Sequence, residues 1–187
     1  MGRSRHHVTR VPSLAPEFRL RQATAADVPT ILQCIRGLAD YERLSHECEA
    51  SEALLHESLF GTSPSAEITL AFVGDVPAGF ALWFRSYSTF LARPGIFLED
   101  LFVFPAWRGR GIGRLLLGEL ARIAVARGYG RLEWAVLDWN VDAIRFYQSL
   151  GAVPMGEWTT FRVAGVALEH LGRRPAGALG PEGAASG

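Results

Sequence analysis

The sequence is poor in cysteine and has no excess of either charge. Its 187 residues include two cysteines, Cys34 and Cys48, which form no Cys-x-x-Cys pair. We therefore expect no disulfide framework and no zinc or redox site built on cysteine. The formal net charge is zero, and the arginines are scattered apart from Arg3, Arg5 and Arg10. Nucleic-acid binders normally carry a basic excess, so no nucleic-acid partner is expected.

Long apolar segments are also missing. No hydrophobic run approaches the length that spans a membrane, and the charged N-terminus lacks the apolar core of a secretory signal. The five histidines show no metal-ligand spacing, so we expect no metal site. Together these absences predict a soluble, cytoplasmic protein with no membrane partner.

The length of the chain suggests a single domain. Residues 1–16 contain prolines and basic residues without periodicity, which predicts a flexible lead. Residues 172–187 are mostly Gly, Ala, Pro and Ser, which predicts a disordered tail because little of this segment could pack into a core. The folded domain is therefore expected over residues 17–171.

Hydrophobic periodicity within this domain alternates between strand-like and helix-like segments. Thr24 and Asn140 are placed to begin helices, and Gly61, Gly128 and Gly151 to end them. Strands are predicted at residues 18–21, 68–73, 78–84, 96–104, 132–137 and 158–168. Helices are predicted after Thr24 and at residues 51–60, 111–127 and 140–150. The order β-α-α-β-β-β-α-β-α-β predicts an α/β (α+β) fold, a mixed sheet with about four helices on its faces.

A glycine-rich turn joins the predicted strand 96–104 to the predicted helix 111–127. Its sequence is Arg108-Gly109-Arg110-Gly111-Ile112-Gly113. The glycines let the backbone approach a ligand, and a helix N-terminus adds unpaired N–H donors, so the turn suits a pyrophosphate. The spacing differs from the dinucleotide-binding G-x-G-x-x-G, and no Lys-Ser/Thr pair follows as in a Walker loop. The structural alternative is a turn with solvated arginines and no ligand.

This turn resembles the acetyl-CoA signature of the GNAT superfamily, Arg/Gln-x-x-Gly-x-Gly/Ala. Three further stretches resemble the spermidine/spermine (diamine) N-acetyltransferase family: Leu98-Glu99-Asp100-Leu101-Phe102-Val103, Trp139-Asn140, and Phe146-Tyr147 with Gly151-Ala152. Tyr41-Glu42 also matches. The resemblance covers about residues 17–170 and implies a GNAT-type, mainly antiparallel sheet. It also implies acetyl-CoA as co-substrate, a small primary amine as acceptor, and a homodimer.

Acetyl transfer to an amine needs a base, because an alkylammonium is almost wholly protonated at pH 7. Glu99 and Asp100 lie inside an otherwise apolar strand. Strict alternation predicts that they point to opposite faces, so that at least one is desolvated. The resemblance implies that Glu99 is the base, directly or through a water, and that Asp100 contacts the acceptor. The alternative is that one of them pairs with a buried arginine.

The resemblance also implies that Tyr147 protonates the CoA thiolate, whereas a core aromatic pair with Phe146 is the alternative. The backbone amides of Leu101 and Val103 are implied contacts of the pantetheine and the carbonyl group. The candidate acceptor-binding residues are Tyr41, Glu42, Glu99, Asp100 and Trp158. The candidate cofactor-binding residues are Leu101, Phe102, Val103, Arg108, Gly109, Arg110, Gly111, Ile112, Gly113, Asn140 and Tyr147.

The chain departs from the polyamine-specific members of that family at one point. Where they place an Asp and a Trp, this chain has Ser88-Thr89-Phe90, and Arg93 follows. A long polyamine loses an anchor there, so a shorter amine or a thialysine-like amino acid becomes a candidate acceptor. Two other functions stay open: acetylation of a protein or peptide, and a non-catalytic acyl-CoA-binding module.

Overall fold

The computed structural model describes residues 18–173, in two units divided after Leu137. The predicted lead, 1–16, and nearly all of the predicted tail, 172–187, lie outside the described residues. The first unit contains β1 (Phe18–Gln22), η1 (Ala25–Asp27), α1 (Val28–Glu42), η2 (Ser45–Glu47), α2 (Glu52–Phe60), β2 (Glu67–Val73), β3 (Val76–Ser88), β4 (Arg93–Val103), η3 (Pro105–Trp107), α3 (Ile112–Ala126) and β5 (Leu132–Trp134). The second contains α4 (Val141–Gln148) and α5 (Gly165–Gly172).

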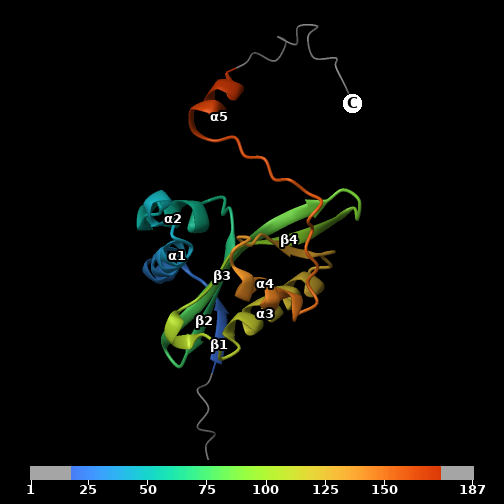
Figure 1. Cartoon of the computed structure of the whole chain (residues 1–187). Helices are drawn as coiled ribbons and strands as arrows, with labels where there is room; N and C mark the ends of the chain where they lie inside the picture. The colour runs from blue at the N-terminus through green and yellow to red at the C-terminus, as the bar shows by residue number, and fades with distance from the viewer. Residues whose placement is uncertain (1–17, 174–187) are drawn as a thin grey trace, which may run out of the picture. The chain divides into compact units, whose positions relative to one another are not determined.

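The first unit is built on a five-stranded sheet in the order β1-β2-β3-β4-β5 (Figure 1). The first four strands are antiparallel neighbours, and β5 pairs in parallel with β4. The predicted mixed, mainly antiparallel sheet is therefore confirmed. Strand β5 is shorter than predicted, and its register with β4 covers only Ile96 to Leu98 of that strand.

Helices α1 and α2 cover one face of this sheet (Figure 1). The helical spacing of Val28, Ile31 and Leu32 places these side chains in one core with Phe80 of β3 and Phe102 of β4. Cys34 belongs to the same core. Its burial raises the pKa of the thiol to about 12, so it is an inert buried thiol.

Helix α3 covers the opposite face, where it contacts β2, β3, β4 and β5. Its buried residues Ile112, Leu116 and Leu120 lie one turn apart, and Trp83 and Ile96 are fully buried within the sheet. Gly128, at φ +68°, follows the helix, and the Tyr129 amide donates to the Ala124 carbonyl at 2.8 Å. This left-handed glycine ends α3 as predicted.

The second unit differs from the sequence-based expectation. The strand predicted at 158–168 is absent from the described residues, and α5 begins instead at Gly165. The alternation of Val166 and Leu168 favoured a strand, but Ala167, Leu168 and Glu169 are good helix formers. A lone extended segment gains little without a partner strand, so local helix propensity prevails there.

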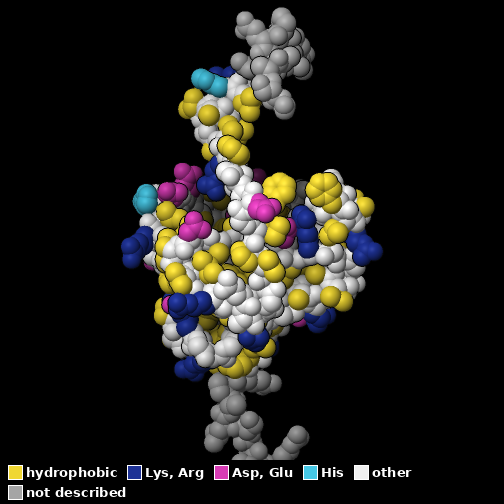
Figure 2. Space-filling model, turned by 45° about the vertical axis from the view of Figure 1, so that its right-hand side comes forward, with side chains coloured by type: hydrophobic (Ala, Val, Ile, Leu, Met, Phe, Trp, Pro, Cys, Tyr) yellow, Lys and Arg dark blue, Asp and Glu magenta, His cyan; other side chains and the backbone are white. Residues whose placement is uncertain are grey.

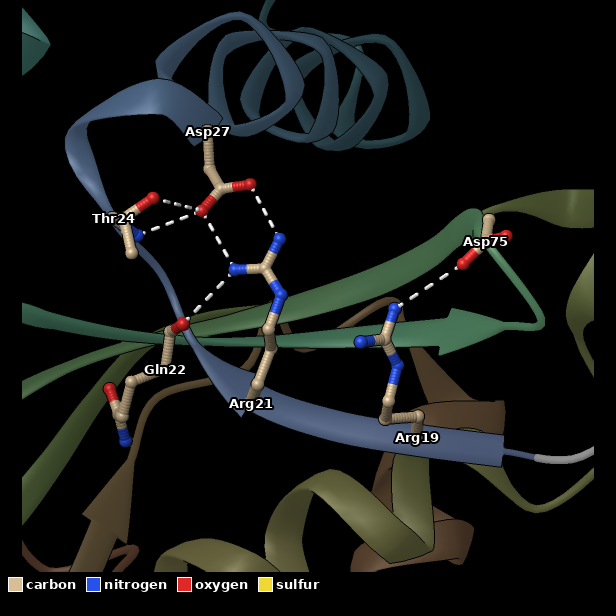
Figure 3. A network of polar contacts seen from close by, with 6 residues as sticks. All are labelled: Arg19, Arg21, Gln22, Thr24, Asp27 and Asp75. Atoms are coloured by element: carbon tan, nitrogen blue, oxygen red, sulfur yellow. Dashed lines mark hydrogen bonds and ion pairs between the residues drawn. The ribbon is translucent and has the colours of Figure 1, made fainter.

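A network of polar side chains fastens β1 to the start of α1 (Figure 3). The Arg21 guanidinium donates to both carboxylate oxygens of Asp27, at 2.8 and 2.7 Å. The Thr24 amide and hydroxyl donate to the same carboxylate at 2.8 and 2.9 Å. The hydrogen bonds from Arg21 hold the pKa of the Asp27 carboxyl well below its usual range. Thr24 thus begins the helical segment as the sequence predicts.

Arg21→Gln is expected to lower the free energy of unfolding by about 1–3 kcal/mol at pH 7, because Asp27 keeps its charge and loses its bidentate partner. A carboxyl with a lowered folded-state pKa stabilises the fold fully above its unfolded pKa. This contribution begins to fall as the pH drops below about 4 and is lost only as the pH passes the much lower folded-state pKa. Urea unfolding at pH 7 and at pH 3 measures both effects.

Arg19→Gln is the matched control on the same strand. Its ion pair with Asp75 measures 3.7 Å and is solvent-exposed (Figure 3), so stability should barely change. Equal losses in the two variants would contradict the role of the Arg21–Asp27 pair.

Candidate active site

The glycine-rich turn lies between β4 and α3, where the sequence predicts it. Gly109 and Gly111 have φ values of +72° and +85°, so both require the left-handed backbone that glycine adopts without strain. Gly111 is the N-cap of α3, no side chain caps the helix, and its first turn contains no acidic residue. The amides of Ile112 and Gly113 therefore stand at an open helix N-terminus, which favours an anion.

The two arginines of the turn have different partners. The Arg110 guanidinium stacks on the Trp107 ring at 4.9 Å. Arg108 instead lies over the Tyr41 ring of α1 at 4.7 Å, and its Nε donates to the Val103 carbonyl at 2.9 Å. The turn therefore joins the end of α1 to the end of β4.

Basic and acidic side chains are both spread over the face of the molecule that Figure 2 presents, among many hydrophobic ones.

The last residues of β4 leave one strand edge open. The Phe104 amide donates to Ala78 of β3 at 3.0 Å. Since successive amides alternate between the two edges of a strand, those of Leu101 and Val103 point away from β3. Pairing with β5 ends at Leu98, so no described strand covers these two amides. The Phe102 side chain packs into the core on the α1 face.

A β-bulge interrupts β4 at Glu99. Leu82 of β3 is opposite Asp100, whereas the next residue, Trp83, is opposite Leu98, so Glu99 is the inserted residue. The expectation that strict alternation governs this strand is therefore wrong. Phe84 is opposite Phe97 and lies on the same face of β3 as Leu82, so Phe97 and Asp100 share a face although three residues separate them.

That shared face is the one covered by α1, and there Asp100 lies close enough to two other carboxylates, Glu99 and Glu42, to be affected by their charges. Asp100 is half-buried and Glu99 is exposed. Desolvation, with the charges of Glu99 and of Glu42 at the end of α1, raises the pKa of Asp100 to about 6. Burial also raises the pKa of Glu42. Among the described residues, no arginine forms an ion pair with Asp100 or Glu99.

An aromatic pair follows on this face, and no local sequence pattern predicts it. The rings of Phe84 and Phe97 lie 5.3 Å apart, on the side of Asp100 that leads towards the β3–β4 turn. Only the register across the bulge reveals that they share the face of Asp100. At the turn itself Ser88 is buried, and its Oγ accepts a hydrogen bond from the Leu91 amide at 3.3 Å.

The second unit carries the remaining candidates. Asn140 caps α4 as predicted, accepting a hydrogen bond from the Ala143 amide at 3.3 Å. Tyr147 lies on α4 with its ring 5.4 Å from that of Phe146. Trp158 lies in the segment between α4 and α5, which has no helix or strand.

Residues 34–152 match the model of the acetyltransferase (GNAT) family. L-ornithine N5-acetyltransferase NATA1 of Arabidopsis thaliana is 34% identical, over 82% of this chain and 87% of its own length. Thialysine N-epsilon-acetyltransferase of Mus musculus is 35% identical, over 83% and 98%. An integron cassette protein from the mobile metagenome of V. cholerae superposes with a TM-score of 0.72 at 25% identity, covering 84% of this chain and 98% of that one. The chain belongs to the GNAT family.

As a GNAT acetyltransferase, the protein is an acyl-transfer enzyme with the mixed α/β fold of that family. The match to the family model includes the carboxylates of β4, the glycine-rich turn and Tyr147, whereas Trp158 lies beyond it. No described helix of this acetyltransferase is both long and apolar enough to cross a membrane.

Proposed function

We propose that this enzyme transfers the acetyl group of acetyl-CoA to a small primary amine. The observation that carries the proposal is the bulge at Glu99, which places unpaired carboxylates beside the open amide edge of β4. A cationic acceptor and an acyl donor thus find their partners on adjacent residues of one strand. The proposal also includes a homodimer, which the family resemblance implies. From the sequence analysis it takes a single domain over residues 17–171 and a cytoplasmic location without nucleic-acid or membrane partners.

The chain offers acetyl-CoA a binding site for each end of the molecule. The amides at the start of α3, with Arg110 beside them, suit the pyrophosphate. The amides of Leu101 and Val103 suit the pantetheine arm and the acyl carbonyl, because a free strand edge pairs with an extended amide chain. When bound, acetyl-CoA supplies the activated acetyl group. Asn140 is assigned to the same cofactor by the family resemblance.

The carboxylate pair removes the proton of the ammonium acceptor. A base with a pKa near the working pH is the most effective, and Asp100, with a pKa of about 6, is largely ionised at pH 7. Glu99 is exposed at the bulge and meets the incoming cation first. We therefore assign the proton transfer to this pair, directly or through a water, and the pH dependence to Asp100.

Tyr147 completes the reaction as the general acid. Its hydroxyl gives a proton to the sulfur of the leaving thiolate, while the acceptor nitrogen forms its bond to the acetyl carbon. The support for this role is the position of Tyr147 on the helix that Asn140 caps, which matches the family's pattern.

The acceptor is short. Leu82 of β3 is the residue opposite Asp100, and Ser88 lies six residues further along that strand. At strand spacing this separates Ser88 from Leu82 by about 20 Å. Its hydroxyl already closes the β3–β4 turn, so that end of the face offers a long polyamine no carboxylate. Phe84 and Phe97 lie in between and suit an alkyl chain or a ring. Two relatives named for ornithine and thialysine point to acceptors of this size, with Tyr41, Glu42 and Trp158 as further acceptor contacts.

Purified protein is expected to release CoA thiol from acetyl-CoA only when an amine is added, with higher kcat/KM for ornithine, thialysine and short diamines than for spermine. The panel also includes lysine and a peptide with a free N-terminus. The chain contains no lysine side chain, so self-acetylation cannot mimic acceptor turnover at lysine. Turnover of the peptide alone would favour a protein acetyltransferase, and CoA binding without any turnover a non-catalytic module.

For the preferred acceptor, kcat/KM should rise with pH through about 6, because Asp100 must lose its proton before it can accept one. Asp100→Asn should remove this step and lower kcat/KM by about 10²-fold. Glu99→Gln and Glu42→Gln each remove a negative charge, so each should move the step to lower pH. If the rise of kcat/KM with pH persists in Asp100→Asn and disappears in Glu99→Gln, then Glu99 is the group responsible for the pH dependence and the roles of the two acids are reversed.

Tyr147→Phe should lower kcat by about 10²-fold and leave the KM for the amine nearly unchanged, since the hydroxyl acts on the leaving sulfur. Tyr87→Phe, at an exposed tyrosine of β3, is the control and should have the wild-type rate. A wild-type kcat in Tyr147→Phe would reduce Tyr147 to the aromatic partner of Phe146.

A further inference from the structure

The end of α1 is held against β4 at two points that lie one helical turn apart. At Gly37 the helix comes so close to β4 that an added Cβ would lie 2.8 Å from the Phe102 ring. At Tyr41 the helix meets Arg108 of the glycine-rich turn, whose guanidinium lies 4.7 Å from the Tyr41 ring. Residues i and i+4 share a helix face, so both contacts fix the same side of α1.

The Arg108 side chain is oriented by three groups at once. Its Nε donates to the Val103 carbonyl at 2.9 Å, and its guanidinium lies over Tyr41 at 4.7 Å and over Phe102 at 5.6 Å. Arg110, two residues later, contacts Trp107 of the short η3 helix. The two charges of the turn therefore differ: Arg110 remains local, whereas Arg108 reaches across to α1.

The residue after Tyr41 is Glu42, the carboxylate of α1 whose charge acts on Asp100. Holding Tyr41 in place also holds Glu42 relative to the acids of β4. We propose that Arg108 is a positioning residue for the acceptor side of the site, acting through Tyr41 on Glu42. This inference rests on the proposed function for its kinetic consequences. It differs from the expectation that Arg108 serves the cofactor phosphates.

The test distinguishes Arg108 from Arg110 by the substrate whose KM rises when each arginine is replaced. Arg108→Ala and Tyr41→Ala should each raise the KM for the preferred amine about five- to thirtyfold, which corresponds to the free energy of one cation–π contact. The double variant should have a KM only slightly higher than that of either single variant. Arg110→Ala is the matched control, since it removes the same charge from the same turn and should raise only the KM for acetyl-CoA. Tyr41→Phe retains the ring and should keep most of the coupling.

A rise confined to the KM for acetyl-CoA in Arg108→Ala, as in Arg110→Ala, would overturn the inference. Additive losses in the double variant would do the same. The contact is also measured without substrate, by a double-mutant cycle on urea unfolding of the four Arg108 and Tyr41 combinations, which must show non-additivity. If the wild-type enzyme turned over no amine, the proposed function would fail, and this cycle would still decide whether the Arg108–Tyr41 link exists.

Discussion

The inserted residue in β4 is the constraint on which the rest of the site depends. A strand with strict alternation would place Glu99 and Asp100 on opposite faces, one under α1 and the other under α3. The bulge turns Asp100 to the α1 side and leaves Glu99 exposed beside it. In that arrangement the charges of Glu99 and Glu42 both act on Asp100, and this repulsion adds to burial in raising the pKa of Asp100.

The fold supports this arrangement from both sides. Gly37 allows α1 to come close to Phe102, which brings the acidic end of the helix to β4. On the other edge of β4, pairing with β5 stops at Leu98, immediately before the bulge. The amides that would otherwise continue the parallel ladder are left for a ligand. The bulge and the early end of β5 thus produce the acidic group and the open strand edge at neighbouring residues.

The sequence could predict much of this, and the limits have physical causes. The elements of the first unit, the capping residues Thr24 and Asn140 and the glycine-rich turn follow from periodicity, capping and glycine placement, which are local signals. The bulge could not be predicted, because nothing in the order Leu98-Glu99-Asp100-Leu101 indicates which residue, if any, is left without a partner on the neighbouring strand. The partner of Arg108 could not be predicted either, since Tyr41 is distant in sequence. At Val166 and Leu168 the alternating pattern was misleading, because a strand depends on a partner that no local pattern specifies.

Strand β4 also separates the two kinds of charge that the reaction brings together. The acids lie at its bulge, whereas Arg110 stays beyond its last residue, Val103, and only Arg108 reaches back to α1. From Asp100 to Phe104 the backbone extends about 13 Å, a distance at which solvent and salt screen exposed charges. In the proposed function, an ammonium acceptor is therefore attracted to the carboxylates, and the phosphates of the donor are attracted to the glycine-rich turn. Because one strand sets this spacing, the proposed function lets the amine nitrogen and the acyl carbon meet between the two charged ends without either charged group leaving its partner.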